Sequence, residues 1–337
     1  MTKPSYLDFD DVASGSEIYR PARDEWAWKA ADVDPDGCVI PLDARCLDEI
    51  AAIVDAMHRH PLPVLLRAPD QFEMPHLSRL IARAKALLDQ APGVAVVDGL
   101  PLDDMDEADA TALFWILGQL IGRPVAQKWD GTMIYHVRDT GQAYGYGVRG
   151  STTRVELFFH IDNAFGRAPP DHVGVLCLRP AARGGVSRFC SVHSLHQRML
   201  EAHPRLLARL YRPLFWDRQA EHAADAPKVA RAPMFACDGR RLKARVNVDL
   251  VRKGYQVASQ AMDSETEDAL TAFRALAADP EFWIELPLER GQLQYLNNRD
   301  VAHYRGGFTD HPDPALKRHL IRTWHRDWGQ PSYDGVH

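Results

Sequence analysis

The sequence predicts an α+β protein in which an N-terminal layer of helices and strands packs on a core of many short strands. Up to about residue 123, apolar residues recur at helical spacing in three stretches with short β-type runs between them. From about residue 124 onward the apolar runs are short, and Gly, Pro and Asp separate them. Such a pattern is typical of a β-sandwich or barrel. We find no repeat or linker, so we predict one compound domain with an N-terminal layer (1–123), a core (124–328) and a tail (329–337).

Within the N-terminal layer, residues 1–37 are predicted to form an irregular arm anchored by Trp26 and Trp28. Asp43 is a suitable cap for the first helix. The apolar spacing predicts helices over 43–58, 76–90 and 107–121, and strands over 38–42, 64–66 and 94–97.

The core is predicted to contain two helices, over 192–211 and 263–278. The short apolar runs predict strands over 133–137, 155–159, 173–178, 186–190, 244–248, 282–286, 293–296 and 319–324. Residues 139–153 form a glycine-rich loop that is either a mobile lid or a flexible surface connection.

Composition excludes several classes of function. The chain has 337 residues, is 46% hydrophobic and carries a net charge of −6 without a long basic block, so no nucleic-acid partner is expected. Its five cysteines form no CxxC pair, which argues against a thiolate zinc site. The start is polar and no apolar run reaches membrane-spanning length, so we expect a cytoplasmic protein without a membrane partner.

A candidate metal site follows the apolar run that ends at Phe159. On an extended strand His160 and Asp162 would face the same side, because side chains two residues apart share a face. We nominate His303 as the third ligand. Two histidines and one carboxylate on one face of an iron leave coordination positions open, as in non-haem Fe(II) oxygenases.

Such an oxygenase needs an electron-rich co-substrate, and a 2-oxo acid can chelate iron while its distal carboxylate pairs with a cation. Arginine suits this task because its planar fork binds a carboxylate through two hydrogen bonds. Arg318 and Arg322 are four residues apart in a predicted strand, so both can face the interior of the core.

Several segments together resemble the Fe(II)/2-oxoglutarate-dependent dioxygenases of the taurine dioxygenase-like and clavaminate synthase-like family. The resemblance covers about residues 95–328. Its pieces are His160-Ile161-Asp162-Asn163, Pro170–Arg179, Gly184-Gly185-Val186-Ser187, Leu296–His303, Phe308-Thr309-Asp310 and Lys317–Trp324.

The resemblance implies a double-stranded β-helix (jelly-roll) core and the cofactors Fe(II), 2-oxoglutarate and O2. It also implies that His160, Asp162 and His303 hold the iron. Ser187 replaces the threonine whose hydroxyl helps to bind 2-oxoglutarate, and Arg318 matches the arginine that pairs with its distal carboxylate.

For the substrate, the resemblance matches Arg322 to a position that binds an acidic group in some members and supports the co-substrate in others. Further candidate substrate contacts are Asn163, Gln127, Asp249 and Arg149, with Tyr144 and Tyr146 as possible lid residues. Asp162 implies hydroxylation and not halogenation, because halogenating relatives lack this carboxylate.

We therefore predict an oxygenase that hydroxylates an unactivated C–H bond of a small carboxylate-bearing molecule and releases succinate and CO2. The same residues suit desaturation or oxidative cyclisation. A non-catalytic binding protein and a cupin-type metal hydrolase or isomerase are the remaining alternatives. A homo-oligomer is compatible with the sequence.

Overall fold

The computed structural model describes residues 7–8, 17–21, 23–143, 145, 147–237 and 239–335. The lid candidates Tyr144 and Tyr146 therefore lie outside the described residues. The helices are α1 (Ala44–Arg59), α2 (Pro75–Leu88), α3 (Glu107–Gly118), α4 (Val192–Ala202), α5 (Pro204–Leu210), α6 (Val248–Val257) and α7 (Ser264–Ala278).

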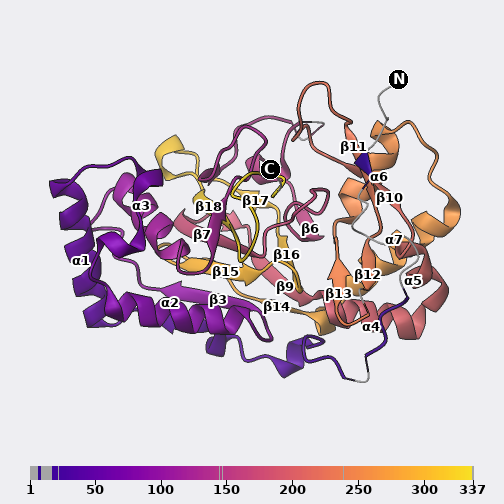
Figure 1. The fold of residues 1–337 in the computed structure, drawn as a ribbon, viewed down its shortest axis with the longest axis horizontal. Coiled ribbons are helices and arrows are strands. Elements are labelled where there is room, and N and C mark those ends of the chain that lie inside the picture. The colour runs from indigo at the N-terminus through magenta and orange to yellow at the C-terminus, as the bar shows by residue number, and fades with distance from the viewer. Residues whose placement is uncertain are drawn as a thin grey trace.

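The strands, most of them short, are distributed over the whole chain (Figure 1). They are β1 (Leu7–Asp8), β2 (Val39–Pro41), β3 (Val94–Asp98), β4 (Arg123–Val125), β5 (Tyr135–Val137), β6 (Leu157–His160), β7 (His172–Arg179), β8 (Arg183–Gly184), β9 (Ser187–Ser191), β10 (Leu214–Asp217), β11 (Val229–Ala232), β12 (Phe235–Cys237), β13 (Leu242–Ala244), β14 (Trp283–Glu285), β15 (Leu293–Asn297), β16 (Val301–Arg305), β17 (Phe308–Thr309) and β18 (His319–Arg326).

The larger sheet has the strand order β2-β3-β15-β7-β18-β4, and β5 also pairs with β18. Side chains alternate across it, as the pleat of a strand requires. On β3, Ala95 and Val97 pack in the cluster that includes helices α1–α3, whereas Val94 and Val96 pack on the opposite side. Strands β2 and β3 of the N-terminal segment thus belong to the same sheet as β7, β15 and β18.

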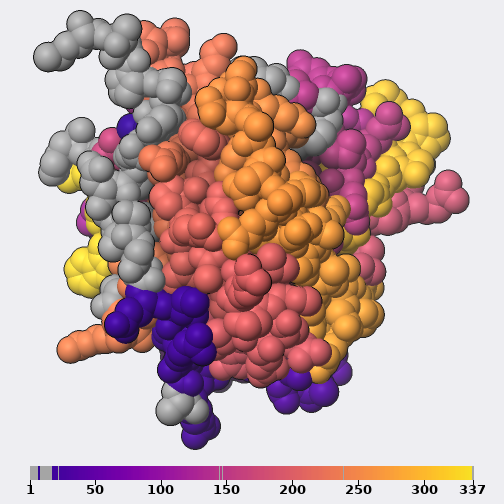
Figure 2. All heavy atoms as spheres, turned by 90° about the vertical axis from the view of Figure 1, so that its right-hand side faces the viewer, coloured from indigo at the N-terminus to yellow at the C-terminus, as the bar shows by residue number. Residues whose placement is uncertain are grey.

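The smaller sheet has the order β14-β9-β16-β6 and shares a hydrophobic core with the larger one. Phe189 and Val301 of the smaller sheet pack in the same cluster as Val173 and Leu296 of the larger sheet. Helices α4–α7 and strands β10–β13 cover the far end of this core (Figure 1). Figure 2 shows the molecule from the right-hand side of Figure 1, where helices α4–α7 and strands β10–β13 form a continuous surface in salmon and orange.

Local capping explains where several helices begin. The Asp43 carboxylate accepts a hydrogen bond from the Cys46 N–H at the start of α1, which confirms the predicted cap. Asn247 caps α6 in the same way, through the N–H of Leu250. The predicted helices over 43–58, 76–90 and 107–121 correspond to α1, α2 and α3.

Three predicted elements are wrong. Val64–Leu66 is a 3-10 turn and not a strand, and Leu65 and Leu66 are exposed. The predicted helix over 192–211 is two helices, because Pro204 cannot continue α4 and instead begins α5. The predicted strand over 244–248 is also wrong, since β13 ends at Ala244 and α6 begins at Val248.

Helix α6 and the pair β10–β11 are present in addition to the predicted elements. Helix α6 packs against β10, and this contact holds its N-terminus beside the metal-site strand, where His160 forms an isolated β-bridge with Asn247. None of the helices in the described part of the chain is long and apolar enough to cross a membrane.

Candidate active site

The smaller sheet places the two candidate histidines side by side. Strands β6 and β16 run antiparallel, and His160 and His303 are direct partners in their register. Their imidazole rings lie with centroids 4.2 Å apart. Two residues far apart in the sequence are thus neighbours because their strands pair.

Asp162 completes the group just beyond the end of β6. Its Oδ1 lies 3.8 Å from Nε2 of His160 and 3.9 Å from Nε2 of His303. The three possible ligand atoms all lie within 4.8 Å of one another. A group of two imidazoles and one carboxylate at this separation fits the donor set of a non-haem Fe(II) site.

The protonation states also fit metal binding. Burial lowers the pKa of His160 and lowers that of His303 to about 3, so both imidazoles are neutral at physiological pH. Nδ1 of His160 lies 2.8 Å from the Phe158 carbonyl and donates to it, which leaves the lone pair on Nε2 facing Asp162. Although burial opposes ionisation, the charge of Arg322 holds the pKa of Asp162 at about 2.

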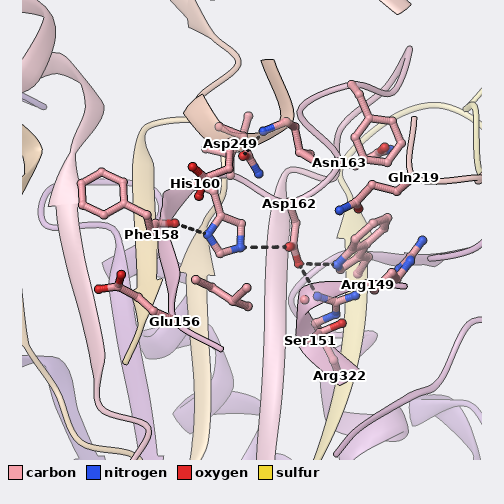
Figure 3. A pocket seen from close by; sticks show the side chains of 17 residues that line it. Arg149, Ser151, Glu156, Phe158, His160, Asp162, Asn163, Gln219, Asp249 and Arg322 are labelled. Carbon is pink, nitrogen blue, oxygen red and sulfur yellow. Dashed lines mark hydrogen bonds and ion pairs between the residues drawn. The ribbon is translucent and has the colours of Figure 1, made fainter. Parts of the chain in front are cut away.

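The second carboxylate oxygen of Asp162 is held from below (Figure 3). Oδ2 accepts a hydrogen bond of 2.8 Å from Nε1 of Trp324 and lies 3.0 Å from Nη1 of Arg322. Arg322 in turn donates through Nε to Oε1 of Gln127 at 2.8 Å. Arg322 therefore orients the carboxylate whose Oδ1 faces the two histidines.

This arrangement corrects the expected role of Gln127. Its side chain is fully buried, and its amide nitrogen donates to the carbonyls of Met133 and Arg322. It lines neither of the two cavities beside the metal group. Gln127 supports Arg322 and is not placed to touch a substrate.

Asn298, in the segment Leu296–His303, has a role that the sequence does not predict. It is fully buried and its Oδ1 accepts the N–H of Asp162 at 2.8 Å. Its Nδ2 donates to the carbonyls of Asp162 and Pro170, at 3.1 and 3.0 Å. The backbone around Asp162 is therefore fixed by one side chain from the turn between β15 and β16. No local pattern in the sequence marks this contact, because the partners are far apart along the chain.

A small cavity adjoins the candidate metal ligands His160 and His303 on the side of β18. Ser187 and Arg318 line it together with His160 and His303, so the structure brings the predicted co-substrate residues to the predicted metal ligands. Arg318 is only 6% exposed, and its Nη1 has no hydrogen-bond partner. Burial lowers the pKa of its guanidinium to about 10. A buried guanidinium facing a cavity without a partner fits the carboxylate of a ligand.

A second cavity opens on the other side of His160 and Asp162, and four of the predicted substrate contacts line it (Figure 3). They are Arg149, Asn163, Asp249 and Arg322. Arg149 forms a buried ion pair with Glu221 at 2.7 Å. Asn163 accepts a hydrogen bond from the hydroxyl of Tyr333, so the C-terminal tail reaches the rim of this cavity.

Glu107, His136 and His319 form another group with metal-ligand atoms close together, among the described residues. Nδ1 of His136 lies 2.9 Å from Nε2 of His319, and the guanidinium of Arg179 lies 3.1 Å from Nδ1 of the same ring. Protein partners thus already occupy both ring nitrogens of His319, and we assign no metal to this group.

Two histidines and one carboxylate around one point form the donor arrangement of non-haem Fe(II) oxygenases. The chain matches the model of the taurine catabolism dioxygenase TauD, TfdA family over residues 58–324, and it belongs to this family. It is a 2-oxoglutarate-dependent dioxygenase that uses Fe(II) and O2.

Individual relatives are distant. The FR-33289 synthase of Streptomyces rubellomurinus is 25% identical over 313 residues, which cover 91% of each chain. A structure of asparagine oxygenase with Fe(II), 3-hydroxyasparagine and succinate superposes with a TM-score of 0.66 at 20% identity, covering 86% of this chain and 94% of that one. The oxygenase OrfP with iron and α-ketoglutaric acid gives a TM-score of 0.59 at 14% identity, over 86% and 94% of the two chains. At such identities the structures show that the fold is shared.

Proposed function

We propose that this dioxygenase hydroxylates an unactivated C–H bond of a small zwitterionic molecule, an amino acid or a related biosynthetic intermediate. In this proposal His160, Asp162 and His303 hold Fe(II), while Ser187 and Arg318 bind the distal carboxylate of 2-oxoglutarate. The bound iron and oxo acid supply the oxidising power, with release of CO2 and succinate. The protein orients the substrate and excludes water from the cavity.

The second cavity, lined by Arg149 and Asp249, is called the outer cavity below. The distribution of charge over its walls supports the proposed class of substrate. Glu156 and Asp249 lie on the His160 side of this cavity, and Arg149 and Arg322 lie on the Asp162 side (Figure 3). The acidic side chains are half exposed, at 50% and 44%, and both pair with Arg274, Asp249 at 3.2 Å and Glu156 at 4.0 Å. Carboxylates attract an ammonium group and guanidiniums attract a carboxylate, so the cavity is complementary to a molecule that carries both.

Two structural neighbours bind molecules of this class. Asparagine oxygenase is described in complex with 3-hydroxyasparagine, and OrfP is described with (3S)-hydroxy-L-Arg. For this chain we propose the shared class, an amino acid or its derivative, and not either compound.

For the fold, we propose that the two sheets form the distorted jelly roll, or double-stranded β-helix, that the sequence resemblance implies. The shared core between the sheets supports this proposal, as does the position of the metal group on two adjacent strands of the smaller sheet.

A substrate screen tests the proposal. The Fe(II)-loaded enzyme is incubated with 2-oxoglutarate, O2 and a panel of amino acids and derivatives, and succinate is measured together with product mass. We expect succinate and a product that has gained one oxygen atom, whereas a product that has lost two hydrogen atoms would indicate desaturation or cyclisation. Asp162→Ala is the control and should form no succinate.

The charged walls are tested separately with Asp249→Asn and Glu156→Gln. We expect each to raise KM for a zwitterionic substrate by roughly tenfold, since one exposed charge pair with the ligand is lost, with unchanged affinity for 2-oxoglutarate. Unchanged KM in both variants would contradict the proposed substrate class.

A further inference from the structure

A second buried arginine lies in the wall of the co-substrate cavity. Arg305 is the last residue of β16, two positions after His303, and it is the register partner of Ser187 on β9. Cross-strand partners share a face of the sheet and have neighbouring side chains. Arg305, Ser187, His303 and Arg318 all line the same cavity.

The guanidinium of Arg305 is poorly satisfied by the protein. Arg305 is 7% exposed, and its Nη2 donates to the Val155 carbonyl. Its Nε and Nη1 are buried without a hydrogen-bond partner. Within the described part of the chain, no carboxylate oxygen lies within 4.0 Å of a guanidinium nitrogen of Arg305 or Arg318.

Arg305 and Arg318 are also close to each other. Each guanidinium carbon lies 5.0 Å from the centre of the same ring, that of Phe308. Two buried like charges beside one ring repel each other, and burial of an unpaired charge is costly. The cavity wall therefore has an excess of positive charge that an anionic ligand can neutralise.

Building on the 2-oxoglutarate site proposed above, we propose that Arg305 is a second binding residue for the distal carboxylate of the co-substrate. Arg318 and Arg305 then hold this carboxylate from two sides, and the hydroxyl of Ser187, the register partner of Arg305, adds a hydrogen bond. A carboxylate has two oxygens and can accept from two guanidiniums at once. The arginine pair makes the site selective for a 2-oxo diacid over a 2-oxo monoacid.

Calorimetric titration of the Mn(II)-loaded protein with 2-oxoglutarate and with pyruvate tests this. Arg305→Met keeps an unbranched side chain but removes the charge. We expect it to weaken 2-oxoglutarate binding by about thirtyfold or more, the loss expected for truncating one partner of a buried charge pair, and to leave pyruvate affinity unchanged. Arg318→Met should behave alike. Arg290→Met is the matched control, because Arg290 is a surface residue paired with Asp103.

Melting temperatures distinguish ligand binding from a structural role through Val155. We expect ligand-free Arg305→Met to melt at or above the wild-type temperature, since a buried unpaired charge is removed, and to gain less stability from 2-oxoglutarate. A lower melting temperature with wild-type affinity for 2-oxoglutarate would overturn the proposal. If Arg305→Met does not fold, Arg305→Lys replaces it. The lysine variant keeps the charge without the planar fork, so its 2-oxoglutarate affinity should still fall, and wild-type affinity would overturn the proposal.

The wild-type titration separates this proposal from the one on which it rests. If the wild-type protein binds no 2-oxoglutarate, the proposed co-substrate site itself is wrong. If wild type and Arg305→Met bind 2-oxoglutarate equally, only the role of Arg305 is wrong.

Discussion

Three side chains hold the polar atoms of Asp162. Trp324 and Arg322 hold its carboxylate, and Asn298 holds its backbone N–H and carbonyl. Asp162 is a proposed iron ligand, and a ligand that is fixed before the metal arrives loses little freedom on binding, so we expect these partners to raise metal affinity.

Replacement of Asn298 by alanine should disturb both stability and metal binding. The change leaves the Asp162 N–H and two buried carbonyls without their partner, at a cost of about 1 to 3 kcal/mol for an unsatisfied buried group. We expect a lower free energy of unfolding in urea and a metal affinity reduced by about 10- to 100-fold. Asn298→Asp is the comparison, because it keeps the oxygen that accepts the Asp162 N–H. Wild-type metal affinity in Asn298→Ala would contradict this role.

Trp324→Phe isolates the hydrogen bond to the carboxylate. Phenylalanine keeps an aromatic ring at the buried position but cannot donate to Oδ2 of Asp162. We expect metal affinity to fall by about tenfold, measured by competition with a chelator. The affinity for 2-oxoglutarate in the metal-loaded variant should not change, because Trp324 lines only the outer of the two cavities.

At the scale of elements, β18 sorts its side chains by the alternation of a strand. Leu320 and Arg322 line the co-substrate cavity, whereas Ile321 packs in the cluster of helices α1–α3. One strand thus supplies groups to the site while it joins the helical layer to the sheet.

Helix α6 is held close to β10 by a glycine. A Cβ on Gly254 would lie 2.3 Å from the carbonyl oxygen of Phe215, which is backbone and cannot move aside easily. Alanine favours a helix over glycine by about 1 kcal/mol, but overpacking costs about 1 to 3 kcal/mol. Because the clash is with backbone, we expect the upper part of this cost, about 2 to 3 kcal/mol, so Gly254→Ala should lower the free energy of unfolding by about 1 to 2 kcal/mol.

The same variant should affect the substrate more than the co-substrate. Asp249 is in the first turn of α6, so a shifted helix moves it relative to the outer cavity. Gly37→Ala is the control, because its nearest neighbour lies at 3.7 Å and alanine fits there. A Gly254→Ala protein as stable as Gly37→Ala in urea would show that α6 adapts.

At the scale of the whole molecule, one buried histidine ties three distant segments together. His193 of α4 lies 2.7 Å from a carboxylate oxygen of Asp24 in the N-terminal arm and 3.0 Å from one of Asp300 in the β15–β16 turn. Arg241 also pairs with Asp300, at 2.6 Å. Burial opposes the charge of His193, but its hydrogen bonds to the two aspartates raise its pKa overall.

This network predicts a particular dependence of stability on pH. A raised pKa means that His193 stabilises the fold fully below its unfolded pKa of about 6.5, and that this contribution is lost as pH rises through the folded pKa. The pKa values of Asp24 and Asp300 are lowered in the folded protein despite their burial, so their contribution is present above about pH 4 and is lost as pH falls further.

His193→Gln should therefore lower the melting temperature most between about pH 4.5 and 6.5, and least at alkaline pH. Removal of one partner from a buried ion pair costs about 3 kcal/mol or more, so the difference should be several degrees. Melting curves of both proteins from pH 5 to 9 measure it. A difference that is constant over this range would exclude titration of His193 as the cause.

Much of the site was predictable, because binding of iron and 2-oxoglutarate requires particular residue types at particular spacings in the sequence. His160, Asp162 and His303 form one group, and Ser187 and Arg318 line the adjoining cavity, as the motifs imply. Gln127 was misjudged because its position in the chain does not reveal that Arg322 and Met133 bury it. The sequence does not predict a ligand-binding role for Arg305, because that role follows from the burial of its guanidinium and from its nitrogens without partners.

The sequence by itself determined the family, the metal and co-substrate chemistry, and the helices of the N-terminal layer, because these depend on local periodicity and on motifs that keep their order. Only the tertiary structure decided how α4 and α5 divide, where α6 lies, and how Asn298, Trp324 and Arg322 hold Asp162. These features depend on burial and on contacts between segments far apart in the chain. Such contacts follow from strand register and packing, which no local pattern encodes.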